Sequence, residues 1–306
     1  MGKNLIVVGN GFDLFHEIKS SYWNFKEYLE QMGYYSFVNS LEKYIDSDEL
    51  WSSFEYALGI LDSDSLKEDN SCYMLGYGDD NWRDSAHHDY QMMIAEELKF
   101  AKYIPAYLEE WILSLNTHRQ RKISSDVINS NNVFLNFNYT DTLEISYGIN
   151  RQKILYIHGK AREYGQLVVG HGNRKMIAIT NRQSFVTEKE QEAYYEYMMG
   201  MDVREQEAQE IIRNYFESTY KDVDRIMEYY KEFFFDLKDI KAVYILGHSL
   251  TDVDLPYFKI INDLLGPQVQ WIVTYYKEDD IDFFRLQLMK AGVGLHQIHM
   301  CRMEQL

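Results

Sequence analysis

Short apolar runs alternate along this chain with longer stretches in which apolar residues recur at helical spacing. The six runs expected to form strands are residues 5–8, 133–135, 154–157, 167–169, 242–246 and 270–274. At least four of them end in a cluster of Gly, Asn or His residues. Parallel sheets place their functional loops beyond the carboxyl ends of the strands. The pattern therefore predicts an α/β protein with a doubly wound, mainly parallel sheet.

Helical spacing predicts what connects these strands. Tyr22, Phe25, Leu29 and Met32 form one stripe, and a second helix is expected over residues 89–115 with an interruption near Pro105. Residues 184–237 contain no proline and are expected to form a helical insertion, so that the sheet domain comprises residues 1–183 and 238–306. Asp202 is a candidate helix cap within the insertion. Residues 62–90 are rich in Asp, Ser, Gly and Asn and predict a loop.

Composition narrows the functional classes. The 306 residues include 31 Lys and Arg against 48 Asp and Glu, a net charge of −17, which argues against direct binding to nucleic acid or to an anionic membrane. Two cysteines, Cys72 and Cys301, are too few for a disulfide framework or a four-cysteine zinc site. No apolar run approaches the roughly 20 residues that span a bilayer, and we expect a soluble, cytoplasmic protein.

The first strand runs into a glycine-containing loop. Its residues are Gly9, Asn10, Gly11, Phe12 and Asp13. Glycines let a backbone approach a ligand, and amides at a helix start attract phosphate. The loop lacks the third glycine of the dinucleotide fingerprint, so a plain strand–helix turn and a nucleotide loop are about equally compatible with it.

Polar side chains follow two further strands. Asn136, Asn138 and Thr140 come after residues 133–135, and His158 comes after residues 154–157. An amide can hold a sugar hydroxyl without titrating, and a histidine can act as a base near neutral pH. His171, which lies between two glycines, repeats the His158 pattern, so spacing alone does not distinguish the two.

A last polar segment follows residues 242–246. Its candidate binding residues are Gly247, His248, Ser249, Asp252 and Asp254. The hydroxyl and carboxylate groups could contact a sugar, or cap a helix that begins near Asp252. The remaining histidines lack the spacing of a metal site, and no metal is expected.

Taken together, these motifs resemble the bacteriophage abortive infection AbiH family. The resemblance runs from residue 5 to about residue 260 and rests on residues 9–13, Trp51, Phe54, Glu55, 136–140, 157–159 and 246–254. That family is in turn similar to the Sir2-like NADase superfamily. The resemblance implies that residues 1–183 and 238–306 form a Sir2-like, Rossmann-type nucleotide-binding domain.

The resemblance also implies an activity. The protein is expected to be an anti-phage effector that hydrolyses NAD+ to ADP-ribose and nicotinamide, with NAD+ as substrate and no cofactor. Asn138 and His158 are the implied catalytic residues. The implied NAD+-binding residues are Gly9, Asn10, Gly11, Phe12, Asp13, Asn136, Thr140, Gly247, His248, Ser249, Asp252 and Asp254. In this picture the amides of residues 9–12 contact the pyrophosphate, and Ser249 with Asp252 or Asp254 meets the distal ribose.

Departures from the superfamily pattern leave an alternative open. Asp13 replaces a small serine and Thr140 replaces an aspartate, which suits a non-catalytic NAD or ADP-ribose-binding sensor or scaffold of a defence complex. A hydrolase of another nucleotide or of a nucleic-acid end is disfavoured by the acidity of the chain, and the cysteine count disfavours a zinc-dependent deacetylase. Gating by homo-oligomerisation or by a sensor protein subunit is expected, through the aromatic-rich helical block.

Overall fold

The computed structural model describes residues 3–76, 78–163, 167–174 and 200–306, together with 187, 189, 191, 192 and 196. Contacts divide the chain into two compact units. The first unit comprises Met1–Phe25, Ala106–Val168 and Asp222–Leu306, and the second comprises Lys26–Pro105 and Val169–Lys221. The predicted insertion, residues 184–237, is divided between the units at Lys221, and its first residues lie outside the described part. The predicted domain boundaries therefore stay a prediction.

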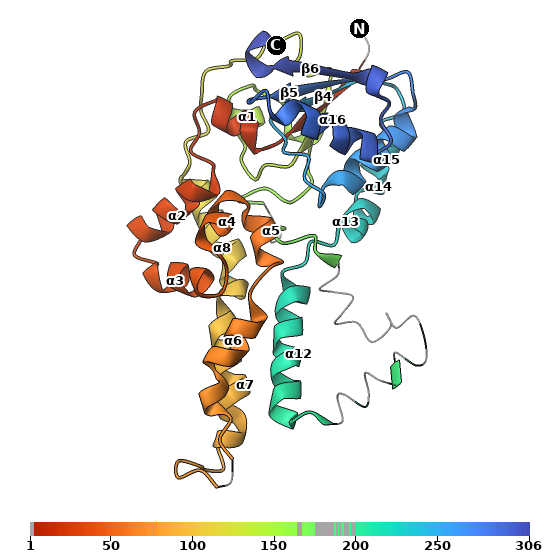
Figure 1. Ribbon diagram of the computed structural model, residues 1–306. Coiled ribbons are helices and arrows are strands. Elements are labelled where there is room, and N and C mark those ends of the chain that lie inside the picture. Colours follow the sequence, from red (N-terminus) through yellow and green to blue (C-terminus); the bar gives the residue numbers. More distant parts are fainter. Residues whose placement is uncertain are drawn as a thin grey trace. The chain divides into compact units, whose positions relative to one another are not determined.

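The first unit is built on a six-stranded sheet in which every neighbouring pair of strands is parallel. The strands are β1 (Lys3–Val8), β2 (Val133–Asn136), β3 (Ile154–Tyr156), β4 (Ile240–Leu246), β5 (Gln270–Tyr275) and β6 (Ile298–Arg302), and Figure 1 shows β4, β5 and β6 together. Their order is β3-β2-β1-β4-β5-β6. This is the order of dinucleotide-binding Rossmann folds, with its switch point between β1 and β4.

Helices cover both faces of this sheet. Successive residues of β1 point to opposite faces: Leu5 and Val7 belong to one apolar core, and Ile6 and Val8 belong to the other. The helices that contribute to the first core are α13 (Val223–Tyr229), α14 (Lys231–Phe235), α15 (Leu255–Leu265) and α16 (Asp280–Lys290). Those that contribute to the second are α1 (Asn10–Phe15) and α9 (Thr142–Ile145). The prediction of a doubly wound α/β fold is thereby confirmed.

The second unit is helical. Its helices are α3 (Tyr35–Lys43), α4 (Ser47–Ser52), α5 (Phe54–Leu58), α6 (Ser63–Asp69), α7 (Ala86–Glu97) and α12 (Val203–Ser218), with short 3-10 turns η1 (Ser71–Tyr73) and η2 (Leu98–Tyr103). The helices α2 (Tyr22–Gln31) and α8 (Ile104–Ser114) each contain a boundary between the units. Lys221, almost wholly buried, forms an ion pair with Glu55. This pair joins the end of the second segment to α5.

Five of the six predicted strands are confirmed as β1 to β5, each within two residues at either end. The prediction of a strand at 167–169 is wrong, since these residues form no strand and the Val168 amide instead donates to the His158 carbonyl. The predicted loop at 62–90 is wrong where α6 and the start of α7 lie. Asp62 begins α6 by accepting hydrogen bonds from the amides of Asp64 and Ser65.

Most of the predicted helices are present in the structure. Three positions of the first predicted stripe, Tyr22, Phe25 and Leu29, lie on α2, whereas Met32 lies beyond its last residue and is exposed. The segment 89–115 is divided into α7, η2 and α8, with the new helix starting at Ile104 immediately before Pro105. Asp202 caps α12 by accepting a hydrogen bond from the amide of Arg204, as predicted. Across the described residues, none of the helices combines the length and apolar character needed to cross a membrane.

Candidate functional site

The loops after β1 and β4 lie in direct backbone contact at the switch point of the sheet. The Gly9 amide donates to the Leu246 carbonyl (3.0 Å), and the Gly11 amide donates to the Gly247 carbonyl (2.7 Å). Gly247 has a φ of +65°, and a Cβ there would lie 2.2 Å from the amide nitrogen of Phe12. Glycine is required at this position because one loop passes directly over the other.

This contact bears on the pyrophosphate assignment. Three of the amides assigned to the pyrophosphate, those of Gly9, Gly11 and Phe12, donate to backbone carbonyl oxygens, the last to Gly9 at 2.9 Å. The Asn10 side chain is bonded to Ser20: its Oδ1 accepts a hydrogen bond from the Ser20 hydroxyl at 2.6 Å, and its Nδ2 donates to the Ser20 carbonyl at 2.9 Å. The loop glycines therefore serve the packing of β1 against β4, and their contact with NAD+ stays a prediction.

Asp13 lies wholly buried on α1 and gathers three donors around its carboxylate. Thr140 donates to Oδ2 at 2.5 Å, Thr142 donates to Oδ1 at 2.7 Å, and the Asn138 amide donates to Oδ2 at 3.2 Å. Burial raises the pKa of Asp13 to about 6, although the hydrogen bonds from Thr140 and Thr142 act in the opposite direction. We call these four residues the Asp13 cluster.

Asn138 is held in one orientation. Its Nδ2 donates to the Gly9 carbonyl at 3.0 Å as well as to Asp13, and its backbone amide donates to Asn136 Oδ1 at 2.9 Å. Both amide hydrogens of the side chain are thus engaged. Among the described residues, no hydrogen bond to Asn138 Oδ1 is seen, so this oxygen is the atom through which the side chain can hold a hydroxyl group.

His158 lies in a second buried group. Its Nε2 is 3.5 Å from the Tyr257 hydroxyl and 3.9 Å from Asp254 Oδ1. The other oxygen of Asp254 is 3.5 Å from Nε2 of His248, so one carboxylate lies between two imidazoles. We call His158, His248, Asp254 and Tyr257 the His158 cluster. Its members come from the ends of β3 and β4 and from the start of α15.

The tautomer of His248 follows from its hydrogen bonds. Its Nδ1 accepts from the Leu250 amide at 2.9 Å, which places the proton of the neutral ring on Nε2, facing Asp254. The Phe137 ring packs edge-on against both histidines, with centroids 5.3 Å from His158 and 4.3 Å from His248. This arrangement can orient an imidazole and stabilise its protonated form, which is what a general base requires.

The structure thus brings together several predicted residues but divides them between two clusters. Asp13, Asn138 and Thr140 meet in one, and His158, His248 and Asp254 meet in the other. Phe137 and Asn138 are consecutive and point into different clusters. The two predicted catalytic residues thus belong to different clusters: Asn138 follows β2 and His158 follows the adjacent strand β3.

Two predicted residues lie elsewhere. Ser249 is exposed, and Asp252 accepts a hydrogen bond from Gln287 on α16 at 3.0 Å. The helix expected to begin near Asp252 begins instead at Leu255, after Asp254, which makes no side-chain cap hydrogen bond. The cap prediction is therefore wrong.

Sequence reasoning missed Thr142 and Tyr257. Each had a signal in its spacing, since Thr142 is two residues after Thr140 and Tyr257 is three residues after Asp254 on a helix. In the part of the chain that the structure describes, no group of three or more His, Cys, Asp or Glu residues could hold a metal ion.

The family model for bacteriophage abortive infection AbiH matches residues 5–275, a span that contains both clusters. Neither the comparison with curated proteins nor that with solved structures found a match. The chain belongs to the bacteriophage abortive infection AbiH family.

Proposed function

We propose that this protein acts in phage defence by hydrolysing NAD+ to ADP-ribose and nicotinamide. Membership of an abortive infection family supports the defence role. The observation that carries the chemistry is the His158 cluster, in which a buried imidazole faces a carboxylate at the carboxyl edge of a sheet with the dinucleotide-binding strand order.

The proposed reaction breaks the bond between nicotinamide and the anomeric carbon of ribose. Charge with oxocarbenium character develops on the ribose, as in glycoside hydrolysis. Nicotinamide leaves as a neutral molecule, so the site needs no acid. A water oxygen then bonds to the anomeric carbon, and His158 accepts the proton that the water loses.

Each cluster has a distinct part in this proposal. In this proposal the His158 ring accepts the proton, and the Asp254 carboxylate, 3.9 Å from Nε2, stabilises the charged ring. Asn138 holds a ribose hydroxyl through Oδ1, because Gly9 and Asp13 fix the orientation of its amide. Gating by oligomerisation or by a sensor subunit remains part of the proposal.

The test is nicotinamide release from NAD+ by full-length protein purified from phage-infected and uninfected cells. His158→Ala should lower the rate at least about 100-fold, the scale of a lost general base. His118→Ala, at an exposed histidine, is the matched control and should keep the wild-type rate.

Two outcomes contradict the proposal. One is equal release by wild type and His158→Ala, and the other is no release by wild type from either source. Calorimetric binding of ADP-ribose without turnover would instead support the alternative role as a non-catalytic sensor or scaffold.

A further inference from the structure

A pocket of about 490 Å³ lies in the first unit beside β3, and neither cluster described above includes its lining residues. One wall is formed by Arg151, which lies just before β3, by the end of β3 and by the residues that follow it. The other wall is formed by α13. The volume falls within the range of small-molecule sites.

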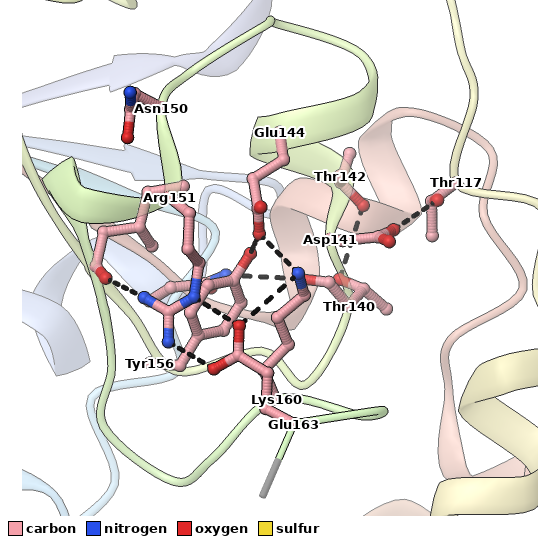
Figure 2. Close-up of polar contacts among 12 residues, drawn as sticks. Thr117, Thr140, Asp141, Thr142, Glu144, Asn150, Arg151, Tyr156, Lys160 and Glu163 are labelled. Atoms are coloured by element: carbon pink, nitrogen blue, oxygen red, sulfur yellow. Dashed lines mark hydrogen bonds and ion pairs between the residues drawn. The ribbon is translucent and has the colours of Figure 1, made fainter.

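The β3 wall is aromatic and carries paired charges. The Arg151 guanidinium lies 4.7 Å from the centre of the Tyr156 ring, and Lys160 Nζ lies 5.6 Å from it. Figure 2 shows that carboxylates compensate both cations: Arg151 pairs with Glu163, and Lys160 pairs with Glu144 at 2.8 Å. Glu144 also accepts a hydrogen bond from the Tyr156 hydroxyl at 2.6 Å. The positive and negative charges of this wall therefore nearly balance.

The α13 wall carries one cation, Arg225, and one carboxylate, Asp222, which accepts a hydrogen bond from the Arg225 backbone amide at 3.1 Å. Asp222, Arg225, Ile226 and Tyr229 are spaced as one face of a helix, and all four line the pocket. Arg225 is exposed, and its guanidinium makes no ion pair or hydrogen bond with any described residue. Tyr229 is 79% exposed, and its ring centre lies 4.7 Å from that of Tyr230.

We propose that this pocket binds a nucleoside phosphate, with its base against Tyr229 and Tyr230 and its phosphate at Arg225. Exposed aromatic rings provide stacking surfaces for bases, and a free guanidinium donates paired hydrogen bonds to phosphate oxygens. In a chain of net charge −17, a guanidinium that forms no ion pair with a described residue offers a local contact for an anion. The same net charge disfavours a long nucleic acid, which presents many phosphates.

The test is calorimetric titration of the full chain with AMP, adenosine and inorganic phosphate. AMP should bind at least about 10-fold more tightly than either adenosine or phosphate alone. Arg225→Ala should weaken AMP about 10-fold and leave adenosine unchanged, because it removes only the phosphate contact. Tyr229→Ala should weaken both AMP and adenosine.

The matched controls are Arg285→Ala and Tyr276→Ala. Arg285 lies on α16, and Tyr276 is exposed to the same 79% as Tyr229. Both controls should bind AMP as the wild type does. Absence of AMP binding, or AMP binding that Arg225→Ala and Tyr229→Ala leave unchanged, would overturn the proposal. If the pocket instead binds a partner protein, no AMP binding should be seen. Because binding is measured directly, the outcome does not depend on whether NAD+ is hydrolysed.

Discussion

Asp13 is a carboxyl group that folding removes from water and surrounds with hydrogen-bond donors. Its position after a strand could be predicted from sequence, and so could the presence of nearby polar residues. Its partners could not, because Thr140, Thr142 and Asn138 reach it from a strand end that is more than 120 positions away. Only the pairing of β1 with β2 brings these groups together.

The raised pKa of Asp13 predicts a pH dependence of stability. The folded state holds this proton more tightly than the unfolded chain does, so the stabilisation is complete below pH 3.8 and is lost as pH rises to about 6. The free energy of unfolding of the wild type, relative to Asp13→Asn, should therefore fall by about 2 kcal/mol between pH 4 and pH 7. Urea unfolding at several pH values measures this difference. Asp252→Asn, at an exposed carboxylate, should show no such trend, and a flat difference for Asp13→Asn would contradict the assignment.

Asp254 is predicted to position His158 for catalysis. Asp254→Asn should lower kcat for NAD+ hydrolysis at least about 10-fold with a smaller change in KM, because the amide no longer stabilises the charged imidazole. Steady-state kinetics measures both constants, and Asp282→Asn, at an exposed carboxylate on α16, serves as the control. A change confined to KM would show that Asp254 binds substrate instead.

At the scale of elements, apolar runs predicted the buried strands well because β1 to β4 have core contacts on both faces. The strand β6 was missed because its sequence, Ile298–Arg302, interrupts apolar residues with polar ones at the edge of the sheet. Residues 167–169 are apolar, as in a strand, but they do not pair with any strand of the sheet. Helix α6 was missed because its residues are almost all polar, and the cap at Asp62 is the feature that marks it.

The contact between the β1 and β4 loops predicts a large cost for a side chain at Gly247. Gly247→Ala should lower the free energy of unfolding by at least about 3 kcal/mol, since it adds a backbone clash to the penalty of a positive φ. Gly33→Ala isolates that penalty, because Gly33 has a φ of +81° with nothing within 4 Å, and it should cost about 1 kcal/mol. Denaturant unfolding compares the two variants. Equal losses would show that the close approach carries no energetic weight.

At the scale of the whole molecule, the doubly wound sheet could be predicted, whereas the two compact units could not. The second unit joins Lys26–Pro105 to Val169–Lys221. Its segments are connected by contacts such as the Asn173 side chain donating to the Gly59 carbonyl at 2.9 Å. Amino-acid composition does not indicate that these two distant segments form one unit. The predicted boundaries at residues 184 and 237 therefore rested on helical spacing alone.

The net charge of −17 predicts an effect of salt on substrate capture. NAD+ is itself anionic, so repulsion should raise KM at low ionic strength. Raising NaCl from about 20 to about 150 mM shortens the Debye length from roughly 20 Å to 8 Å, and KM should fall while kcat stays constant. Initial rates across this range provide the measurement. A KM that rises with salt would reveal a local positive field at the site.

The strand order also has a consequence for how the protein is made. Leu5 of β1 pairs with Val133 and Val243, so β1 must wait for partners that are synthesised much later. Asp254 comes later still, and the His158 cluster is incomplete without it. A chain whose translation stops early carries no assembled cluster. For the NAD+ hydrolase proposed above, we expect copies that terminate before Asp254 to be inactive.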